Sequence, residues 1–128
     1  MELITAADIT DSVLVGRVTG EELAFANEAV VRLAATYGVK EETIVASASN
    51  LAKRYAVVIA CRECCLNLVG TDPTVQMDGA RQDDIYERKY KLYDAMSKDI
   101  LKGLTLADFA GAEDGGGAWT KTVNIYRG

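Results

Sequence analysis

Two long segments near the middle of the chain constrain its fold more than any other feature. Residues 49–70 read SNLAKRYAVVIACRECCLNLVG, and residues 83–106 read DDIYERKYKLYDAMSKDILKGLTL. Each has the length and the mixture of apolar and charged residues of a long helix. The short polar stretch between them favours an antiparallel pair. The sequence therefore predicts a mainly α protein, a small helical bundle built around this pair.

The first of these segments is apolar almost all the way round its middle. Residues 57–61 read VVIAC, and the charged residues lie toward the two ends of the segment. A helix of this kind is usually enclosed by neighbours on most sides. Ser47 and Ser49 can each cap its start, and Gly70 can end it. We therefore expect a buried central helix from about residue 50 to residue 69.

Shorter helices are predicted before the central one. Thr19 and Glu22 form a capping-box pattern at the start of residues 20–37, and Gly38 fits the left-handed residue that ends a helix. Residues 40–47 are predicted to form a short helix or a turn, and the opening TAADI stretch a brief helix.

A last long helix is predicted over residues 84–102. Asp83 and Asp84 lie at its start and Lys98 and Lys102 at its end, as the helix dipole favours. One stripe at helical spacing is expected to face the core, with its lysine burying the stem and keeping the amine in water. The stripe comprises Ile85, Lys89, Leu92, Met96 and Ile100, with Tyr86 and Tyr93 beside it.

The chain changes character after this helix. Residues 105–109 are a short apolar patch, and residues 111–117, GAEDGGG, have the composition of a flexible linker. Residues 119–126, WTKTVNIY, have the alternation of a β segment. The sequence thus predicts a helical body, residues 1–110, and an extended, glycine-tethered arm, residues 111–128.

A single strand needs a hydrogen-bonding partner. Residues 12–18, SVLVGRV, can supply one within the chain, and a strand on another protein can supply one outside it. We predict that the arm docks on a partner, with packing against its own body as the alternative. The predicted partner-docking residues are Trp119, Val123, Ile125 and Tyr126.

Charge and composition limit the classes of function that the chain can have. The net charge is −5, and there is no histidine. Tight binding to nucleic-acid phosphates or to an anionic membrane needs concentrated lysine and arginine, so neither is predicted. An acidic wall nonetheless lets DNA slide past without sticking. Histidine is the commonest general base and metal ligand, and we predict no catalytic residue, no cofactor and no metal, and hence not an enzyme.

Three cysteines lie within five residues of each other, in the stretch CRECC: Cys61, Cys64 and Cys65. At helical spacing they share one face, deep within the predicted central helix. A zinc site needs four ligands, and a redox dithiol usually lies at a helix start. We interpret the three as small core residues, with a metal-binding or redox module as the alternative. Their odd number and the absence of a secretory pattern indicate a reduced, cytosolic chain.

Two further groups admit a functional and a structural interpretation. Tyr86, Tyr90 and Tyr93 can stack bases or pack in the core. Carboxylates around the predicted loop of residues 71–82 can bind a cation, act as an acid pair, or cap a helix; they are Asp72, Asp78, Asp83, Asp84 and Glu87. We prefer packing for the tyrosines and capping for the carboxylates.

Several stretches, taken in order, carry a resemblance to a known family. They are the opening LITAADI, a helix over residues 21–37, the buried helix 51–68, and residues 88–106, which run from RKY to ILKG and on to LTL. In this order the chain resembles the head–tail connector (adaptor) proteins of tailed bacteriophages, including the Mu-like branch. Where that family usually has an arginine-rich turn before the buried helix, this chain has TYGVK.

The resemblance implies a structural virion protein. It implies a homo-oligomeric ring of about a dozen copies beneath the portal protein, lining the channel by which double-stranded DNA leaves, with a downstream neck or tail-completion protein as a further partner. It places the protein at the head–tail junction of the virion, and in the host cytoplasm before assembly. A small helical regulatory domain that binds another protein is a third possibility.

Overall fold

The computed structural model describes residues 2–71 and 84–111, which are α-helical apart from one 3-10 turn and the connecting loops. No strand occurs among these residues. The elements are η1 (Ala6–Asp8), α1 (Gly20–Thr36), α2 (Glu41–Ser47), α3 (Asn50–Leu68), α4 (Ile85–Gly103) and α5 (Leu106–Ala110). The prediction of a mainly α fold is confirmed.

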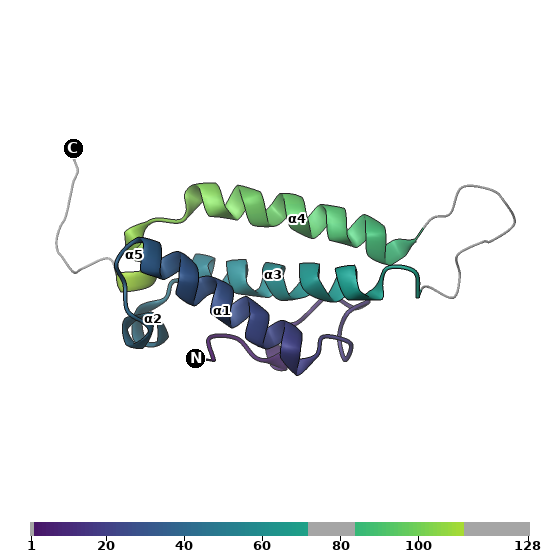
Figure 1. Ribbon diagram of the computed structural model, residues 1–128, viewed down its shortest axis with the longest axis horizontal. Helices are drawn as coiled ribbons and strands as arrows, with labels where there is room; N and C mark the ends of the chain where they lie inside the picture. The colour runs from purple at the N-terminus through teal and green to yellow at the C-terminus, as the bar shows by residue number, and fades with distance from the viewer. Residues whose placement is uncertain (1, 72–83, 112–128) are drawn as a thin grey trace, which may run out of the picture.

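Helix α3 is the centre of the bundle. Figure 1 shows α4 running antiparallel to α3 along one side, while α1 crosses α3 on another side. The contact between α3 and α4 is the most extensive in the molecule, followed by that between α1 and α3. The predicted antiparallel pair and the buried central helix are therefore both present.

Local capping explains where the helices begin and end. The Thr19 hydroxyl accepts from the amide of Glu22 at 3.3 Å, and the Glu22 carboxylate accepts from the amide of Thr19 at 2.9 Å, which is the predicted capping box. Ser49 caps α3 by accepting from the amide of Ala52 at 3.1 Å. Gly38 follows α1 with a φ of 79°, a conformation that side chains with a Cβ rarely adopt.

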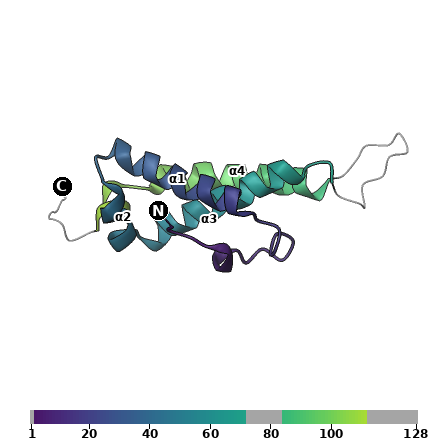
Figure 2. The same cartoon turned by 60° about the horizontal axis from the view of Figure 1, so that its bottom comes forward.

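The N-terminal segment, residues 2–18, packs against the bundle with little regular structure of its own (Figure 2). Ile4, Ile9 and Leu14 are each at most 5% exposed. Asn27 of α1 ties the segment down: its Oδ1 accepts from the amides of Leu3 and Ile4 at 2.9 and 3.0 Å, and its Nδ2 donates to the Ile4 carbonyl at 3.3 Å.

The suggestion that residues 12–18 supply a strand is wrong. Residues 12–17 form turns, in which the amides of Leu14 and Val15 donate to the carbonyl of Asp11 at 3.0 and 2.9 Å. Leu14 is fully buried by this arrangement, so the apolar residues of the stretch serve to anchor a loop.

The predicted core stripe of α4 is wrong at Leu92, which is 54% exposed. The most buried α4 side chains are instead Tyr86, at 6%, and Ser97, at 3%. Both have hydrogen-bond partners: Arg17 donates to the Tyr86 hydroxyl at 2.7 Å, and Ser97 donates to the Asp94 carbonyl at 2.7 Å. Polar groups that form hydrogen bonds can be buried at little cost in free energy. The buried face of α4 therefore includes Tyr86 and Ser97 and leaves Leu92 exposed.

One end of the bundle is closed by α2 and α5 (Figure 1). The apolar patch predicted at residues 105–109 contains most of a short helix, because Thr105 and Asp108 form another capping box. Ser49 fastens this helix to the start of α3: its amide donates to the Asp108 carbonyl at 2.8 Å, and its hydroxyl to the Asp108 carboxylate at 2.7 Å. The ring of Phe109, fully buried, lies 5.5 Å from that of Tyr37.

Candidate functional site

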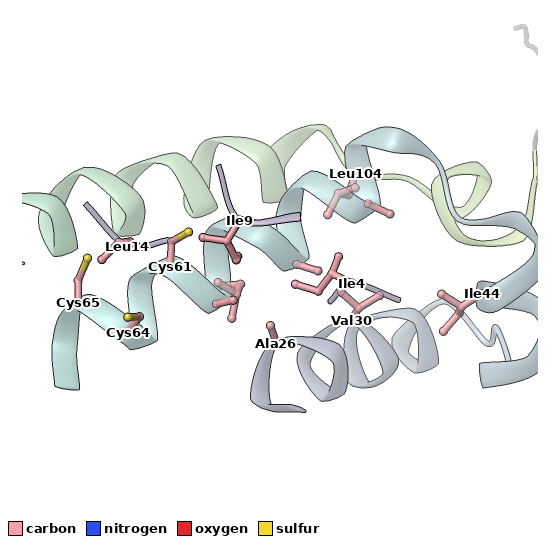
Figure 3. Close-up of a cluster of buried hydrophobic side chains, with 14 of the residues drawn as sticks. Ile4, Ile9, Leu14, Ala26, Val30, Ile44, Cys61, Cys64, Cys65 and Leu104 are labelled. Carbon is pink, nitrogen blue, oxygen red and sulfur yellow. The ribbon is translucent and has the colours of Figure 1, made fainter. Parts of the chain in front are cut away.

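The cysteine cluster belongs to the core. Cys61 is 2% exposed, and Cys64 and Cys65 are fully buried. Figure 3 shows the three on α3, with Cys61 near Leu14 and Ile9 of the N-terminal segment. All three are free thiols. Their interpretation as small core residues agrees with this placement.

The surroundings of these thiols suppress the thiolate that redox and metal chemistry need. Burial, followed by the nearby Asp11 carboxylate, raises the pKa of Cys61 to about 11. Burial raises the pKa of Cys64 and of Cys65 to about 12, with Glu22 the next cause for Cys64 and Cys61 the next for Cys65. Within residues 2–71 and 84–111, no three His, Cys, Asp or Glu side chains are placed to hold a metal ion.

The carboxylate of Asp11, a partly buried residue, joins the N-terminal segment to α4. Its Oδ2 accepts from the Lys89 ammonium at 2.9 Å and from the Tyr93 hydroxyl, and its Oδ1 accepts from the amide of Val13 at 2.8 Å. The Asp11 side chain is 9% exposed. Burial alone would raise its pKa, but the hydrogen bonds from Tyr93 and Lys89 outweigh burial and leave the pKa lowered. Burial and the bond to Asp11 raise the pKa of Tyr93.

A groove of about 410 Å³ lies beside this cluster, between the N-terminal segment, α3 and α4. Its size is in the range of pockets that hold ligands. The floor is apolar and includes Val57, Val58 and Met96, with Cys61 and Tyr93 at one end. A second hollow of about 250 Å³, lined by Leu51, Ile100 and Asp99, shares Arg54 and Met96 with the first. We call the two together the α3/α4 groove.

The wall of the α3/α4 groove carries charge of both signs. Lys53 and Arg54 are exposed near the start of α3. In the part of the chain that the structure describes, neither forms an ion pair, whereas Arg32, Arg62 and Lys89 each do. Two adjacent unpaired cations on an acidic protein provide a place for negative charge to bind. The carboxylates of Asp8 and Asp11 line the same groove.

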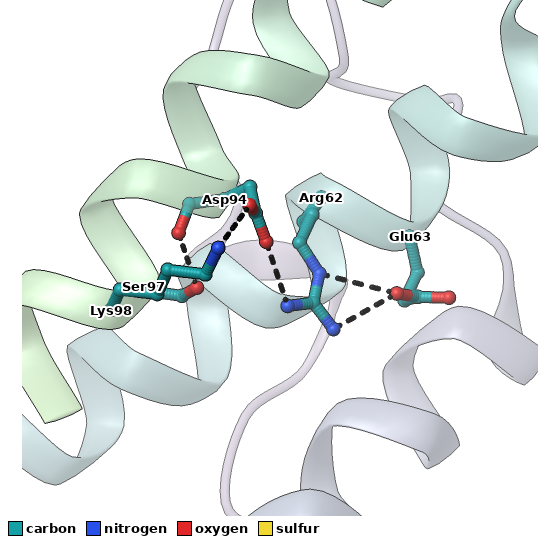
Figure 4. Close-up of polar contacts among 5 residues, drawn as sticks. All are labelled: Arg62, Glu63, Asp94, Ser97 and Lys98. Carbon is teal, nitrogen blue, oxygen red and sulfur yellow. Dashed lines mark hydrogen bonds and ion pairs between the residues drawn. The ribbon is translucent and has the colours of Figure 1, made fainter.

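A separate polar cluster ties α3 to α4 and is structural (Figure 4). The Arg62 guanidinium binds Glu63 of its own helix at 3.1 Å and Asp94 of α4 at 3.4 Å. Asp94 also pairs with Lys98 at 3.1 Å. The hydrogen bond from Lys98 is the largest cause of the lowered pKa of Asp94. Every charge in the cluster has a partner within the subunit.

Large apolar side chains are exposed on more than one side of the body. Phe25 of α1 is 49% exposed, and on α4 Leu92 and Leu101 are 54% and 41% exposed. Val45 of α2 is 59% exposed. Because α1 and α4 pack on different sides of α3, these side chains do not form one continuous patch.

The remaining predicted site residues divide into two sets. Asp84 caps α4, accepting from the amide of Tyr86 at 2.9 Å, and Glu87 pairs with Lys91 at 3.6 Å, as the capping and solvated-face interpretation expects. Tyr86 is buried and Tyr90 is partly buried, as packing expects. The predicted docking residues Trp119, Val123, Ile125 and Tyr126 lie outside the described residues, as do Asp72, Asp78 and Asp83.

Sequence reasoning missed the Asp11 cluster and the α3/α4 groove. Asp11 forms an ion pair with Lys89, which lies 78 residues further along the chain. No local sequence pattern indicates such a contact. The Lys53-Arg54 pair did carry a signal, because adjacent cations near the start of a helix oppose the preference of that end for negative charge.

No single helix in the described ranges is long and apolar enough to cross a membrane, and the one pair that passes by length and composition, α2 with α3, is bent by 109°. No family model, curated protein or solved structure matches the chain.

Proposed function

We propose that the protein is a structural connector that assembles side by side into a ring. A ring requires a heterologous interface, in which one face of each copy meets a different face of the next. The observation that carries the proposal is the exposure of Phe25 on α1 and of Leu92 on α4, two helices that pack on different sides of α3. Each copy therefore has two separate apolar faces to offer.

The resemblance to bacteriophage head–tail connectors gives this ring a place, beneath the portal protein and around the path of the DNA. The net charge of −5 suits a wall past which DNA moves, because phosphates are repelled rather than held. In this proposal the C-terminal arm, with its predicted β segment, latches onto a neighbouring copy or the portal through Trp119, Val123, Ile125 and Tyr126.

The two-face arrangement is tested with Phe25→Arg and Leu92→Arg, each purified and mixed with the portal protein. Each variant keeps one face intact, so each alone is expected to give no ring by native mass spectrometry. A mixture of the two is expected to form heterodimers that stop at two copies. Lys40→Glu, at an exposed residue between α1 and α2, is the matched control and should still form rings. Rings from either face variant alone would refute the assignment of these faces.

The arm is tested by removing residues 112–128. The helical body is expected to keep its circular dichroism spectrum, because its described helices pack on one another around a shared core of buried residues, but to lose assembly on the portal. Normal assembly by the truncated protein would refute the latch. A stoichiometry of one copy per partner would instead support the alternative of a helical protein-binding domain.

A further inference from the structure

The α3/α4 groove begins beside the point where the described chain leaves the body. The start of α3 is joined to α5, since the Ser49 amide donates to the Asp108 carbonyl at 2.8 Å. A Cβ placed on Gly111 would lie 3.6 Å from Ser47. Asn50, the first residue of α3, already lines the groove. The chain after Gly111 therefore starts next to the mouth of the groove.

The charges in the groove follow an order along α3. Lys53 and Arg54 come first, one turn into the helix. The end of the groove at Cys61 lies about 11 Å further along the helix axis at 1.5 Å per residue, and Asp11 lies there beside Tyr93. Asp11 is already paired with Lys89 at 2.9 Å, so the charges in the groove that stand ready for a partner are those of Lys53 and Arg54.

The chain beyond Gly111 begins with negative charge and continues with apolar residues. Glu113 and Asp114 come first, and they are within about 10 Å of Gly111 at 3.3 Å per residue. Trp119 and the alternating apolar residues come next. Of the positive charges in the segment, Lys121 lies among these apolar residues and Arg127 follows them.

From this match we propose that, in the isolated subunit, the C-terminal segment docks in the α3/α4 groove of its own chain. Glu113 and Asp114 pair with Lys53 and Arg54, and the apolar side chains beginning at Trp119 cover the floor formed by Val57 and Met96. Tethering favours this site, because a short linker gives an effective concentration in the millimolar range. The inference needs no ring; if both proposals hold, assembly replaces the docking in the chain's own groove with docking in a neighbour's.

Trp119 is the only tryptophan in the chain, so its fluorescence reports the docking directly. In the full chain at micromolar concentration, we expect blue-shifted emission that resists acrylamide quenching and does not change on dilution. Lys53→Glu with Arg54→Glu should weaken docking by roughly tenfold, giving red-shifted emission and stronger quenching. The reversal Glu113→Lys with Asp114→Lys in the same chain should restore the wild-type emission.

Arg32→Glu with Lys91→Glu is the matched control. It changes the charge by the same amount at side chains that are 79% and 74% exposed, away from the groove, and should leave the emission unchanged. Wild-type emission typical of a fully hydrated indole would overturn the proposal, as would an equal effect of the control. Emission that shifts to the red on dilution would also overturn it, because Trp119 would then be covered by a second copy. A ring defect without any change in Trp119 emission bears on the connector proposal alone.

Discussion

The tie between Asp11 and α4 gives the sharpest test of how the N-terminal segment is held. Asp11→Asn keeps the size of the side chain and one oxygen acceptor but removes the negative charge. Hydrogen bonds to a charged group contribute more than neutral ones, and Asp11 accepts from both Lys89 and Tyr93 while only 9% exposed. We expect a loss of about 2 kcal/mol in the free energy of unfolding and a fall of about 8 °C in Tm.

The same tie predicts a pH dependence with a definite sign. The pKa of Asp11 is lowered in the folded protein from its ordinary value of 3.8. A lowered pKa contributes stability that is fully present above the unfolded value and is lost as the pH falls through the folded one. The difference in stability between the wild type and Asp11→Asn should therefore be full at pH 7 and shrink progressively below about pH 3.8.

Urea unfolding followed by circular dichroism, repeated across this pH range, measures both effects. Asp99→Asn is the matched control, because Asp99 is 80% exposed and its contact with Lys102 is 3.9 Å long; we expect a change below about 0.5 kcal/mol. A difference for Asp11→Asn that persists unchanged at low pH would show that the charge is not what stabilises the segment. No difference at pH 7 would refute the tie itself.

Three further variants test the core and the helix start. Leu14→Ala, at a fully buried site, should cost about 3 kcal/mol, while Val15→Ala next to it, at 56% exposure, should cost less than about 0.5 kcal/mol in the same urea unfolding measurement. Ser49→Ala removes the cap of α3 and the bond to Asp108 and should lower the free energy of unfolding by about 1 kcal/mol. Thiol labelling at pH 8 should be slow in the native protein and fast in urea, because burial raises the pKa of Cys64 to about 12; rapid native labelling would contradict the core placement.

The parts of the fold that depend on neighbouring residues could be predicted from the sequence. Thr19 with Glu22, and Ser49 before α3, mark helix starts through bonds that span three residues. Gly38 and Gly70 mark helix ends because both have positive φ. The enclosure of α3 followed from its apolar run, and its bounds followed from the capping residues before it and from Gly70 after it. In each case the residues that carry the sequence pattern lie within one or two helical turns of the feature that they predict.

The parts that failed depend on contacts between distant residues. Leu92 belongs to the predicted apolar stripe of α4, but Tyr86 is buried in the structure and Leu92 is not. The Tyr86 hydroxyl accepts a hydrogen bond from Arg17, which lies in a loop 69 residues earlier in the chain. Residues 12–18 have the composition of a strand, but Leu14 is drawn into the core and the backbone turns around Asp11. Tertiary burial overrides local β propensity in such cases.

The N-terminal segment links the Asp11→Asn stability measurement to the Trp119 fluorescence measurement. It has little regular structure, yet Ile4, Asp8 and Asp11 form one wall of the α3/α4 groove. A wall held by three anchoring side chains and one partly buried carboxylate is the part of the groove that yields first when its tie is weakened. Asp11→Asn should therefore increase the acrylamide quenching of Trp119 while the helical circular dichroism stays constant. If quenching stays constant although stability falls, the segment holds the bundle together but takes no part in the docking.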